Sequence, residues 1–227
     1  MFYLIFIADK TFIIMVILID NGHGHNTSGK YSPLLKNSGL DIDAAFIKDG
    51  RFKEYLYTRF IAKDIVDILK SMDYDARLLT PEDNDISLSE RVNRVNKVCN
   101  TYGAGNVLLI SIHANAIGDG NNWMTGKGWE AYTTRGTTNS DKLASFLYKR
   151  AHSNFENRNV REDWSDGDAD KESDFYIIKK ANCPAVLSEN FFFTNQEDLK
   201  YMTSDEGLHA VVRTHVEGII DYIESKK

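Results

Sequence analysis

The chain has 227 residues, 42% hydrophobic and 26% charged, which is enough to bury the core of one globular domain. Its net charge is -6, and its lysines and arginines are scattered, which excludes the basic stripe of a nucleic-acid-binding protein. Cys99 and Cys183 form no C-x-x-C pair. We therefore expect buried free thiols rather than a disulfide framework or a thiolate zinc site.

The N-terminal residues 1–14 are apolar, but Asp9 and Lys10 interrupt them. Neither a basic leader nor a small-residue cleavage site accompanies them, so we expect neither a signal peptide nor a membrane span. Met15 stands directly before the next apolar run. We expect residues 1–14 to be an N-terminal extension, with an extra edge strand as the alternative, and residues 15–227 to form one domain.

Short β-branched runs then alternate with longer segments of helical period. This pattern predicts an α/β fold, with one mixed, mostly parallel sheet and helices on both faces. We expect strands at 13–19, 74–79, 107–112, 129–134 and 185–187, and helices at 52–72, 88–102, 141–155 and 206–223. Ser87 and residues 139–141 are expected to cap two helices. The glycine-rich segment 118–128 and the acidic segment 156–174 are expected to be surface loops beside a site.

The stretch DNGHGHNTSGKYS, residues 20–32, follows the first predicted strand and fits two kinds of site. From Gly24 to Lys30 it reads G-x-x-x-x-G-K, as in a phosphate-binding loop. Such a loop needs Ser or Thr directly after the lysine to hold magnesium, and a helix that begins there. Tyr31 occupies the hydroxyl position and Pro33 opposes a helix, so we do not expect nucleotide binding.

A metal site is the other interpretation of this stretch. His23 lies three residues past Asp20, where the first strand is expected to end, and His113 directly follows the strand at 107–112. The carboxyl ends of parallel strands meet at one edge of a sheet, so the two imidazoles are expected to meet there. Gly22 and Gly24 are expected to let the chain turn tightly around His23. His25 is an alternative ligand from the same loop.

Zinc bound by two histidines needs a third protein ligand and an open position for water. Glu54 opens a predicted helix on the face that packs on the sheet, and Glu130 is the rival ligand. Hydrolysis also needs a proton carrier. Glu189 leaves a buried strand as His113 does, and a glutamate there is costly unless it is paired or solvated at a site. The residues thus favour metal-assisted amide or ester hydrolysis.

Four segments carry a family resemblance. They are ILIDNGHG at 17–24, SLSERVNRVN at 87–96, LLISIHANA at 108–116 and CPAVLSENFFFTNQED at 183–198. In this order they resemble the zinc-dependent N-acetylmuramoyl-L-alanine amidases of the amidase-3 type, from residue 16 to about 223. Residues 15–227 are therefore expected to be an amidase-3-like catalytic domain. The family usually has proline where Asn21 stands, and often glycine where His25 stands.

The resemblance implies zinc as the cofactor, with His23, Glu54 and His113 as its ligands. It implies hydrolysis of the amide between N-acetylmuramic acid and L-alanine in peptidoglycan, with a zinc-bound water as nucleophile and Glu189 as general acid and base. Trp129, Arg161 and Asp168 flank the expected site and are predicted to contact substrate. Arg91 is expected to be structural, as an ion-pair or cap partner.

Peptidoglycan, a glycan strand with stem peptides, is the implied partner. We expect a monomer that binds no nucleic acid and has no membrane span. Without a convincing signal peptide, a released phage-type lysin or an enzyme exported by another route is expected. Two alternatives stay open, a non-catalytic peptidoglycan-binding module of the same fold and a zinc peptidase that cuts within the stem peptide.

Overall fold

The computed structural model describes residues 15–36 and 38–227, and the predicted extension at 1–14 lies outside these described residues. The strands are β1 Val16–Asn21, β2 Ile47–Lys48, β3 Arg51–Phe52, β4 Asp75–Leu78, β5 Val107–Asn115, β6 Trp129–Thr133, β7 Lys171–Glu172 and β8 Ala185–Phe192. The α-helices are α1 Glu54–Ser71, α2 Leu88–Tyr102, α3 Asn139–Asn154, α4 Tyr176–Lys179, α5 Gln196–Met202 and α6 Asp205–Glu224. Two short 3-10 helices are η1 Ala44–Phe46 and η2 Ala104–Asn106.

Six strands form the main sheet in the order β4-β1-β5-β8-β6-β7, and β2 and β3 form a separate hairpin. The strands β4, β1, β5 and β8 run parallel, whereas β6 pairs with β8 in the antiparallel direction and β7 runs parallel to β6. This arrangement confirms the predicted single α/β domain with a mixed, mostly parallel sheet. It also brings the carboxyl ends of β1, β5 and β8 to one edge.

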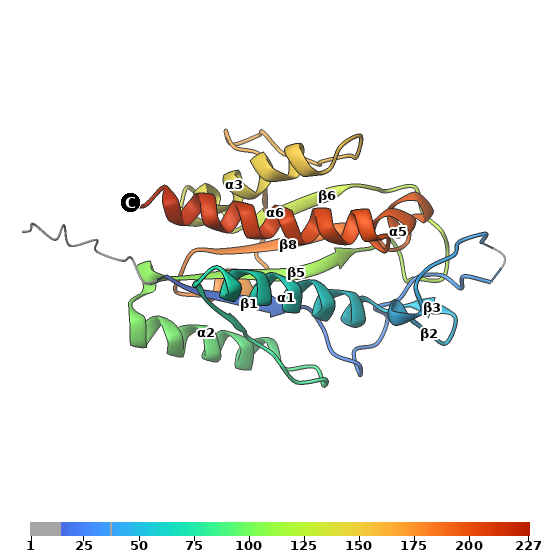
Figure 1. Cartoon of the computed structure of the whole chain (residues 1–227), viewed down its shortest axis with the longest axis horizontal. Helices are drawn as coiled ribbons and strands as arrows, with labels where there is room; N and C mark the ends of the chain where they lie inside the picture. Colours follow the sequence, from blue (N-terminus) through green and yellow to red (C-terminus); the bar gives the residue numbers. More distant parts are fainter. Residues whose placement is uncertain (1–14, 37) are drawn as a thin grey trace, which may run out of the picture.

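Helices cover both faces of the sheet, as Figure 1 shows. Successive residues of β1 point to opposite faces of the sheet and enter two separate cores. Ile17 and Ile19 pack in the core that α1, α3 and α6 cover, whereas Val16 and Leu18 pack in the core that α2 and α4 cover. A strand that is buried on both faces reads as an unbroken apolar run, which explains the run at the start of the described chain.

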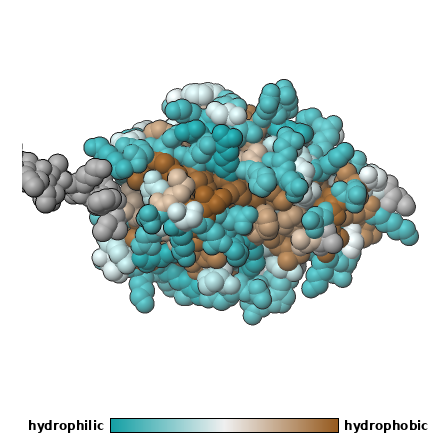
Figure 2. All heavy atoms as spheres, in the orientation of Figure 1, coloured by the Kyte–Doolittle hydropathy of each residue, from teal (hydrophilic) through white to brown (hydrophobic). Residues whose placement is uncertain are grey.

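The surface in Figure 2 is mostly hydrophilic, with hydrophobic side chains along the middle, where α1 and α6 pack against each other. On α1, Phe60 and Ile68 are 40% and 41% exposed. Single exposed apolar residues are normal on soluble proteins. Among the described residues, no helix is both long enough and apolar enough to cross a membrane.

The four long helices and five of the strands lie where the sequence places them, within two or three residues at most ends, apart from longer carboxyl ends for β5 and β8. Ser87 caps α2 as predicted, accepting a hydrogen bond from Glu90 N at 3.2 Å. The cap of α3 is Thr138, one residue before the predicted range, and Asp141 completes a capping box with it. Cys99 and Cys183 are buried and free, as expected.

Candidate active site

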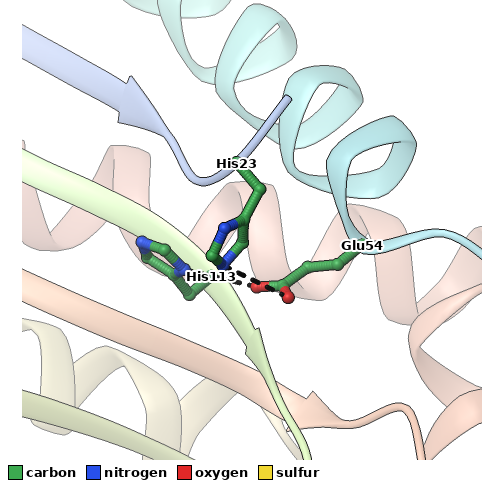
Figure 3. Close-up of side chains that lie close together, drawn as sticks. All are labelled: His23, Glu54 and His113. Carbon is green, nitrogen blue, oxygen red and sulfur yellow. Dashed lines mark hydrogen bonds and ion pairs between the residues drawn. The ribbon is translucent and has the colours of Figure 1, made fainter. Parts of the chain in front are cut away.

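Three elements bring two histidines and a glutamate together at the carboxyl edge of the sheet (Figure 3). His23 lies on the loop after β1, His113 lies near the end of β5, and Glu54 is the first residue of α1. The distance from His113 Nδ1 to Glu54 Oε1 is 3.3 Å, and the distance from His23 Nε2 to Glu54 Oε2 is 3.5 Å. One donor atom from each side chain lies within 4.8 Å of the other two. The sequence-predicted trio is therefore assembled in the fold.

Glu54 is the most deeply buried member of the group, with 1% of its surface exposed. Its Oε1 accepts a hydrogen bond from the backbone N–H of Ala114 at 3.0 Å, whereas its Oε2 is buried with no hydrogen-bond partner among residues 15–36 and 38–227. Burial raises the pKa of Glu54, but the hydrogen bond with His113 and the charge of His23 outweigh burial and lower it. The carboxylate is thus held in its ionised form, which is the form that binds a cation.

The two histidines differ in their protonation. Burial lowers the pKa of His23 to about 4, despite the opposing charge of Glu54, so this imidazole is neutral at pH 7. Burial also lowers the pKa of His113, but its hydrogen bond with Glu54 and the charge of Glu189 outweigh burial and raise it. In the part of the chain that the structure describes, the Nε2 atom of His23 is buried without a hydrogen-bond partner. A bound cation would satisfy both this nitrogen and the unpaired Glu54 oxygen.

His23 itself adopts the left-handed conformation, with φ 66°, which is uncommon for a residue other than glycine. Two side chains of α1 hold the strained loop: Thr58 Oγ1 donates to Gly22 O at 2.9 Å, and an Arg59 N–H donates to His23 O at 2.9 Å. The glycines were expected to supply the turn. Instead, neither Gly22 nor Gly24 has a positive φ. Glycine is required at both positions because neighbouring atoms lie too close to leave room for a Cβ.

Arg91, a buried residue of α2 with 2% of its surface exposed, holds the carboxyl end of β1 in place. Its guanidinium contacts Asp20 Oδ1 at 2.5 Å and Asp85 Oδ1 at 2.9 Å, and it donates to Asn21 O at 2.8 Å. The predicted structural role of Arg91 as an ion-pair partner is confirmed. A cavity of about 270 Å³ lies between this arginine and the two site histidines.

Glu189 lies on β8 directly beside His113 of β5 in the sheet register. Its side chain is partly buried, and no described residue makes a hydrogen bond to its buried Oε2. Burial raises the pKa of Glu189 to about 8; the nearby His113 lowers it and Glu54 raises it. The side chain is therefore suited to hold or release a proton near neutral pH.

Residues 17–221 match the Amidase_3 family, described as N-acetylmuramoyl-L-alanine amidase. The chain belongs to this family. It is 23% identical to the endolysin of Bacillus phage SPP1, over 93% of this chain and 67% of that protein. It is 25% identical to the N-acetylmuramoyl-L-alanine amidase CwlM of Bacillus licheniformis, over 89% of this chain and 66% of that protein.

The chain thus spans about two thirds of the length of these two relatives. The crystal structure of an N-acetylmuramoyl-L-alanine amidase from Clostridium difficile 630 has the same fold, with a TM-score of 0.71 and 24% identity over 94% of this chain and 98% of that chain. The structure of the catalytic domain of CwlV, an N-acetylmuramoyl-L-alanine amidase from Bacillus (Paenibacillus) polymyxa, matches with a TM-score of 0.68. Its sequence is 23% identical, and the match covers 92% of this chain and 98% of that chain. The amidase family and hydrolase class expected from the sequence are confirmed.

In this amidase-family chain the group of His23, Glu54 and His113 fits a divalent metal ion by its chemistry. Two imidazole nitrogens and one carboxylate are a ligand set of catalytic zinc sites. Lys30 Nζ is 4.0 Å from Glu54 Oε2, and Lys30 O accepts the hydrogen bond of Glu54 N at 3.1 Å. The lysine of the G-x-x-x-x-G-K stretch therefore lies against the acidic member of the group.

The rival ligand Glu130 is not part of this group, because other side chains occupy its carboxylate. Lys171 Nζ lies 2.7 Å and Arg161 Nε 2.6 Å from its Oε2, and Asn115 and Tyr132 donate hydrogen bonds to its Oε1. Glu130 faces Glu189 in the register of β6 and β8. The Arg161 side chain, which is 35% exposed, therefore lies beside the site, and its contact with substrate stays a prediction.

The other predicted site residues lie elsewhere in the amidase-family fold. Trp129 is fully buried, where its Nε1 donates to Asn190 Oδ1 at 2.9 Å, so the predicted contact with substrate is wrong. Its position on the pleated strand turns the ring into the core, which hydropathy alone does not indicate. His25 is exposed and its Nδ1 lies 3.3 Å from Asp83 O, outside the metal-ligand group. Asp168 lies beside the edge strand β7, close to two other aspartates.

Proposed function

We propose that this chain hydrolyses the amide between the lactyl group of N-acetylmuramic acid and L-alanine in peptidoglycan. One observation carries the proposal: an ionised, buried carboxylate holds two histidines at the sheet edge where Glu189 lies in register with His113. The names of the relatives, an endolysin and amidases, support the same substrate and an action on the bacterial cell wall. An exported enzyme and a released phage-type lysin both agree with this action.

His23, Glu54 and His113 would hold a zinc ion. When bound, zinc supplies a Lewis acid that polarises the scissile carbonyl and makes water a nucleophile near neutral pH. The residues of the chain do the rest. Glu54 orients both imidazoles, and the left-handed loop aims His23 at the carboxylate. The substrate would enter beside the cavity that adjoins the two histidines.

Glu189 is the general acid and base of the proposed reaction. Its carboxylate takes a proton from the attacking water and passes that proton to the departing amine, which leaves poorly as an anion. Because its pKa is raised to about 8, the ionised Glu189 carboxylate is a stronger base than an ordinary glutamate. Arg161 forms an ion pair with Glu130 on β6, and Glu130 faces Glu189 on the neighbouring strand β8. Arg161 is therefore proposed to contact a charged group of the peptidoglycan substrate.

The test is mass spectrometry of purified peptidoglycan after digestion. We expect free stem peptides with an L-alanine N-terminus and glycan strands that keep the lactyl carboxylate. A chelator should abolish the release, and added Zn²⁺ should restore it. Peptide fragments from strands that keep L-alanine on the muramic acid would show a zinc peptidase instead. Binding to the wall without any released product would show a non-catalytic module, and either result would overturn the proposal.

A further inference from the structure

A second group of carboxylates lies apart from the amidase site, at the sheet edge formed by β6 and β7. Asp141 is in the first turn of α3, and Asp168 and Asp170 belong to the segment that leads into β7. One oxygen of each side chain lies within 4.8 Å of the other two. The three residues come from two elements that are far apart in the sequence, so the fold assembles the group.

Two of the three carboxylates are buried and Asp168 is partly buried, which distinguishes the group from an ordinary acidic surface. Asp170 is 2% exposed and Asp141 is 7% exposed. Within the described residues, none of the three carboxylates has a lysine, arginine or histidine within 4.0 Å. The adjacent cation, Lys171, is directed to Glu130, with Nζ 2.7 Å from its Oε2. Burying like charges without a counter-ion is costly, so such a group calls for a proton or a cation.

Hydrogen bonds satisfy only part of the group. Thr133 Oγ1 donates to Asp170 Oδ2 at 2.6 Å, and the backbone N–H of Thr138 donates to Asp141 Oδ2. Asp170 Oδ1 and Asp168 Oδ1 are both buried, and no amide, amine or hydroxyl group of the described residues donates a hydrogen bond to either. Asp170 is thus an almost fully buried side chain with an unpaired oxygen, next to two more carboxylates. Unpaired buried oxygens of this kind need a partner that the described side chains do not supply.

We propose that Asp141, Asp168 and Asp170 bind a calcium ion. Carboxylate oxygens without nitrogen or sulfur ligands select hard cations. Calcium is coordinated by oxygens at about 2.3–2.6 Å, so two of its ligands lie up to about 5 Å apart, in agreement with the spacing within the group. Magnesium demands a smaller and more regular shell, which suits three side chains on a loop and a helix less well.

The ion would tie the segment before β7 to the end of β6 and the start of α3. Asp163 N already donates to Ala169 O at 3.1 Å, which closes the loop between them. The same segment carries Arg161 and Lys171, whose cationic groups contact Glu130 beside the amidase site. Calcium would therefore order one wall of that site without taking part in the chemistry.

The alternative is a carboxyl pair that shares a proton. Burial, a hydrogen bond with Asp168 and the charges of Asp168 and Asp141 raise the pKa of Asp170 to about 7, despite the hydrogen bond from Thr133. A proton and a calcium ion differ in one result: only bound calcium gives the wild type a stabilisation by Ca²⁺ that Asp170→Asn lacks. If the group only shares a proton, Asp170→Asn mimics its stable form and calcium has no effect on either protein.

The experiment is thermal unfolding of the zinc-loaded full chain in CaCl₂ or MgCl₂ at constant ionic strength. We expect the Tm to rise by about 5–10 °C when Ca²⁺ reaches about 100 times its Kd, with a smaller rise in Mg²⁺. Asp170→Asn and Asp168→Asn should each lose this rise while keeping zinc content and far-UV circular dichroism. Without calcium, Asp170→Asn should unfold at or above the wild-type temperature, because it removes a repulsive charge.

Asp166→Asn is the matched control, because Asp166 is exposed in the same loop and lies outside the group. It should keep the full calcium response. Equilibrium dialysis with radioactive calcium should give one ion per wild-type chain and less than one-tenth of that in Asp170→Asn at the same concentration. A wild-type Tm that does not change at 10 mM Ca²⁺, or a full response in Asp170→Asn, would overturn the site. An equal response to Mg²⁺ would overturn its assignment to calcium.

Discussion

Glu54 is the residue on which the proposed metal site depends most, because its carboxylate contacts both histidines from a buried position. We predict that Glu54→Ala lowers zinc affinity by more than about 100-fold, beyond the effect of losing a residue that only supports a ligand. Bound zinc is measured by atomic emission after dialysis. Glu130→Gln is the control and should keep one zinc per chain, since Glu130 is bound by Lys171 and Arg161 instead. Full zinc content in Glu54→Ala would remove Glu54 from the ligand set.

Glu189 tests the chemistry separately from metal binding. Glu189→Gln keeps the shape of the side chain but cannot accept a proton, so we predict a loss of about 10²–10⁴-fold in kcat with unchanged zinc content. Release of stem peptides under saturating substrate is the measurement. Glu156→Gln, at an exposed position just after α3, should retain full activity. Near-normal turnover of Glu189→Gln would exclude Glu189 as the proton carrier.

At the scale of elements, the loop after β1 must pass so close to β5 that a single methyl group is too large. A Cβ on Gly22 would lie 2.4 Å from Cε1 of His113. We predict that Gly22→Ala displaces the imidazole, lowers zinc affinity and activity, and costs about 1–3 kcal/mol of unfolding free energy, as overpacking does. Zinc content and urea unfolding would measure both effects.

Gly105→Ala is the matched control for that glycine. A Cβ there meets no atom of the described residues within 4 Å, and the backbone φ is not positive. The free energy of unfolding of Gly105→Ala should therefore differ from the wild type by less than about 0.5 kcal/mol. If Gly22→Ala behaves like Gly105→Ala, the imidazole accommodates the methyl group and the close approach has no functional role.

The elements that could be predicted from the sequence are those whose local pattern agrees with their burial. The α1 helix carries Ile61 and Ile65 on its buried face, and β1 is apolar throughout because both of its faces are covered. The short pieces could not be predicted in this way. The two-residue strand β7 exists because Lys171 and Glu172 pair with the end of β6, a contact between distant segments that no local pattern reveals.

The candidate site shows the same division. His23 and His113 could be placed together because parallel strands end at one edge of the sheet, and Glu54 could be added from its helix face. The predicted contact of Trp129 with substrate is wrong because the pleat of β6 decides which of its side chains reach the surface. The hydropathy of the residues in the strand does not show this. The partnership of Asp141 with Asp170 depends on α3 docking beside β6, so the sequence showed only the local D-G-D-A-D run.

At the scale of the whole molecule, His215 joins the last helix to the strand that carries Glu189. It is fully buried in α6, with its Nε2 2.8 Å from Ser188 Oγ and its Nδ1 2.8 Å from Val211 O. Burial lowers the pKa of His215 from 6.5 to about 4, despite the hydrogen bond to Val211. Between these values the unfolded chain binds the proton and the folded chain does not. Stability from this group is therefore complete above about pH 6.5 and is lost as the pH falls towards 4.

We predict that this single histidine makes acid destabilise the fold by about 3 kcal/mol between pH 7 and pH 4, because each tenfold difference in acidity is worth about 1.4 kcal/mol. Urea unfolding of the wild type and His215→Gln at matched zinc concentration measures it. Glutamine does not titrate, so the free-energy difference between the two proteins should shrink by about that amount as the pH falls. Parallel pH profiles for wild type and His215→Gln would mean that the buried imidazole does not control acid unfolding.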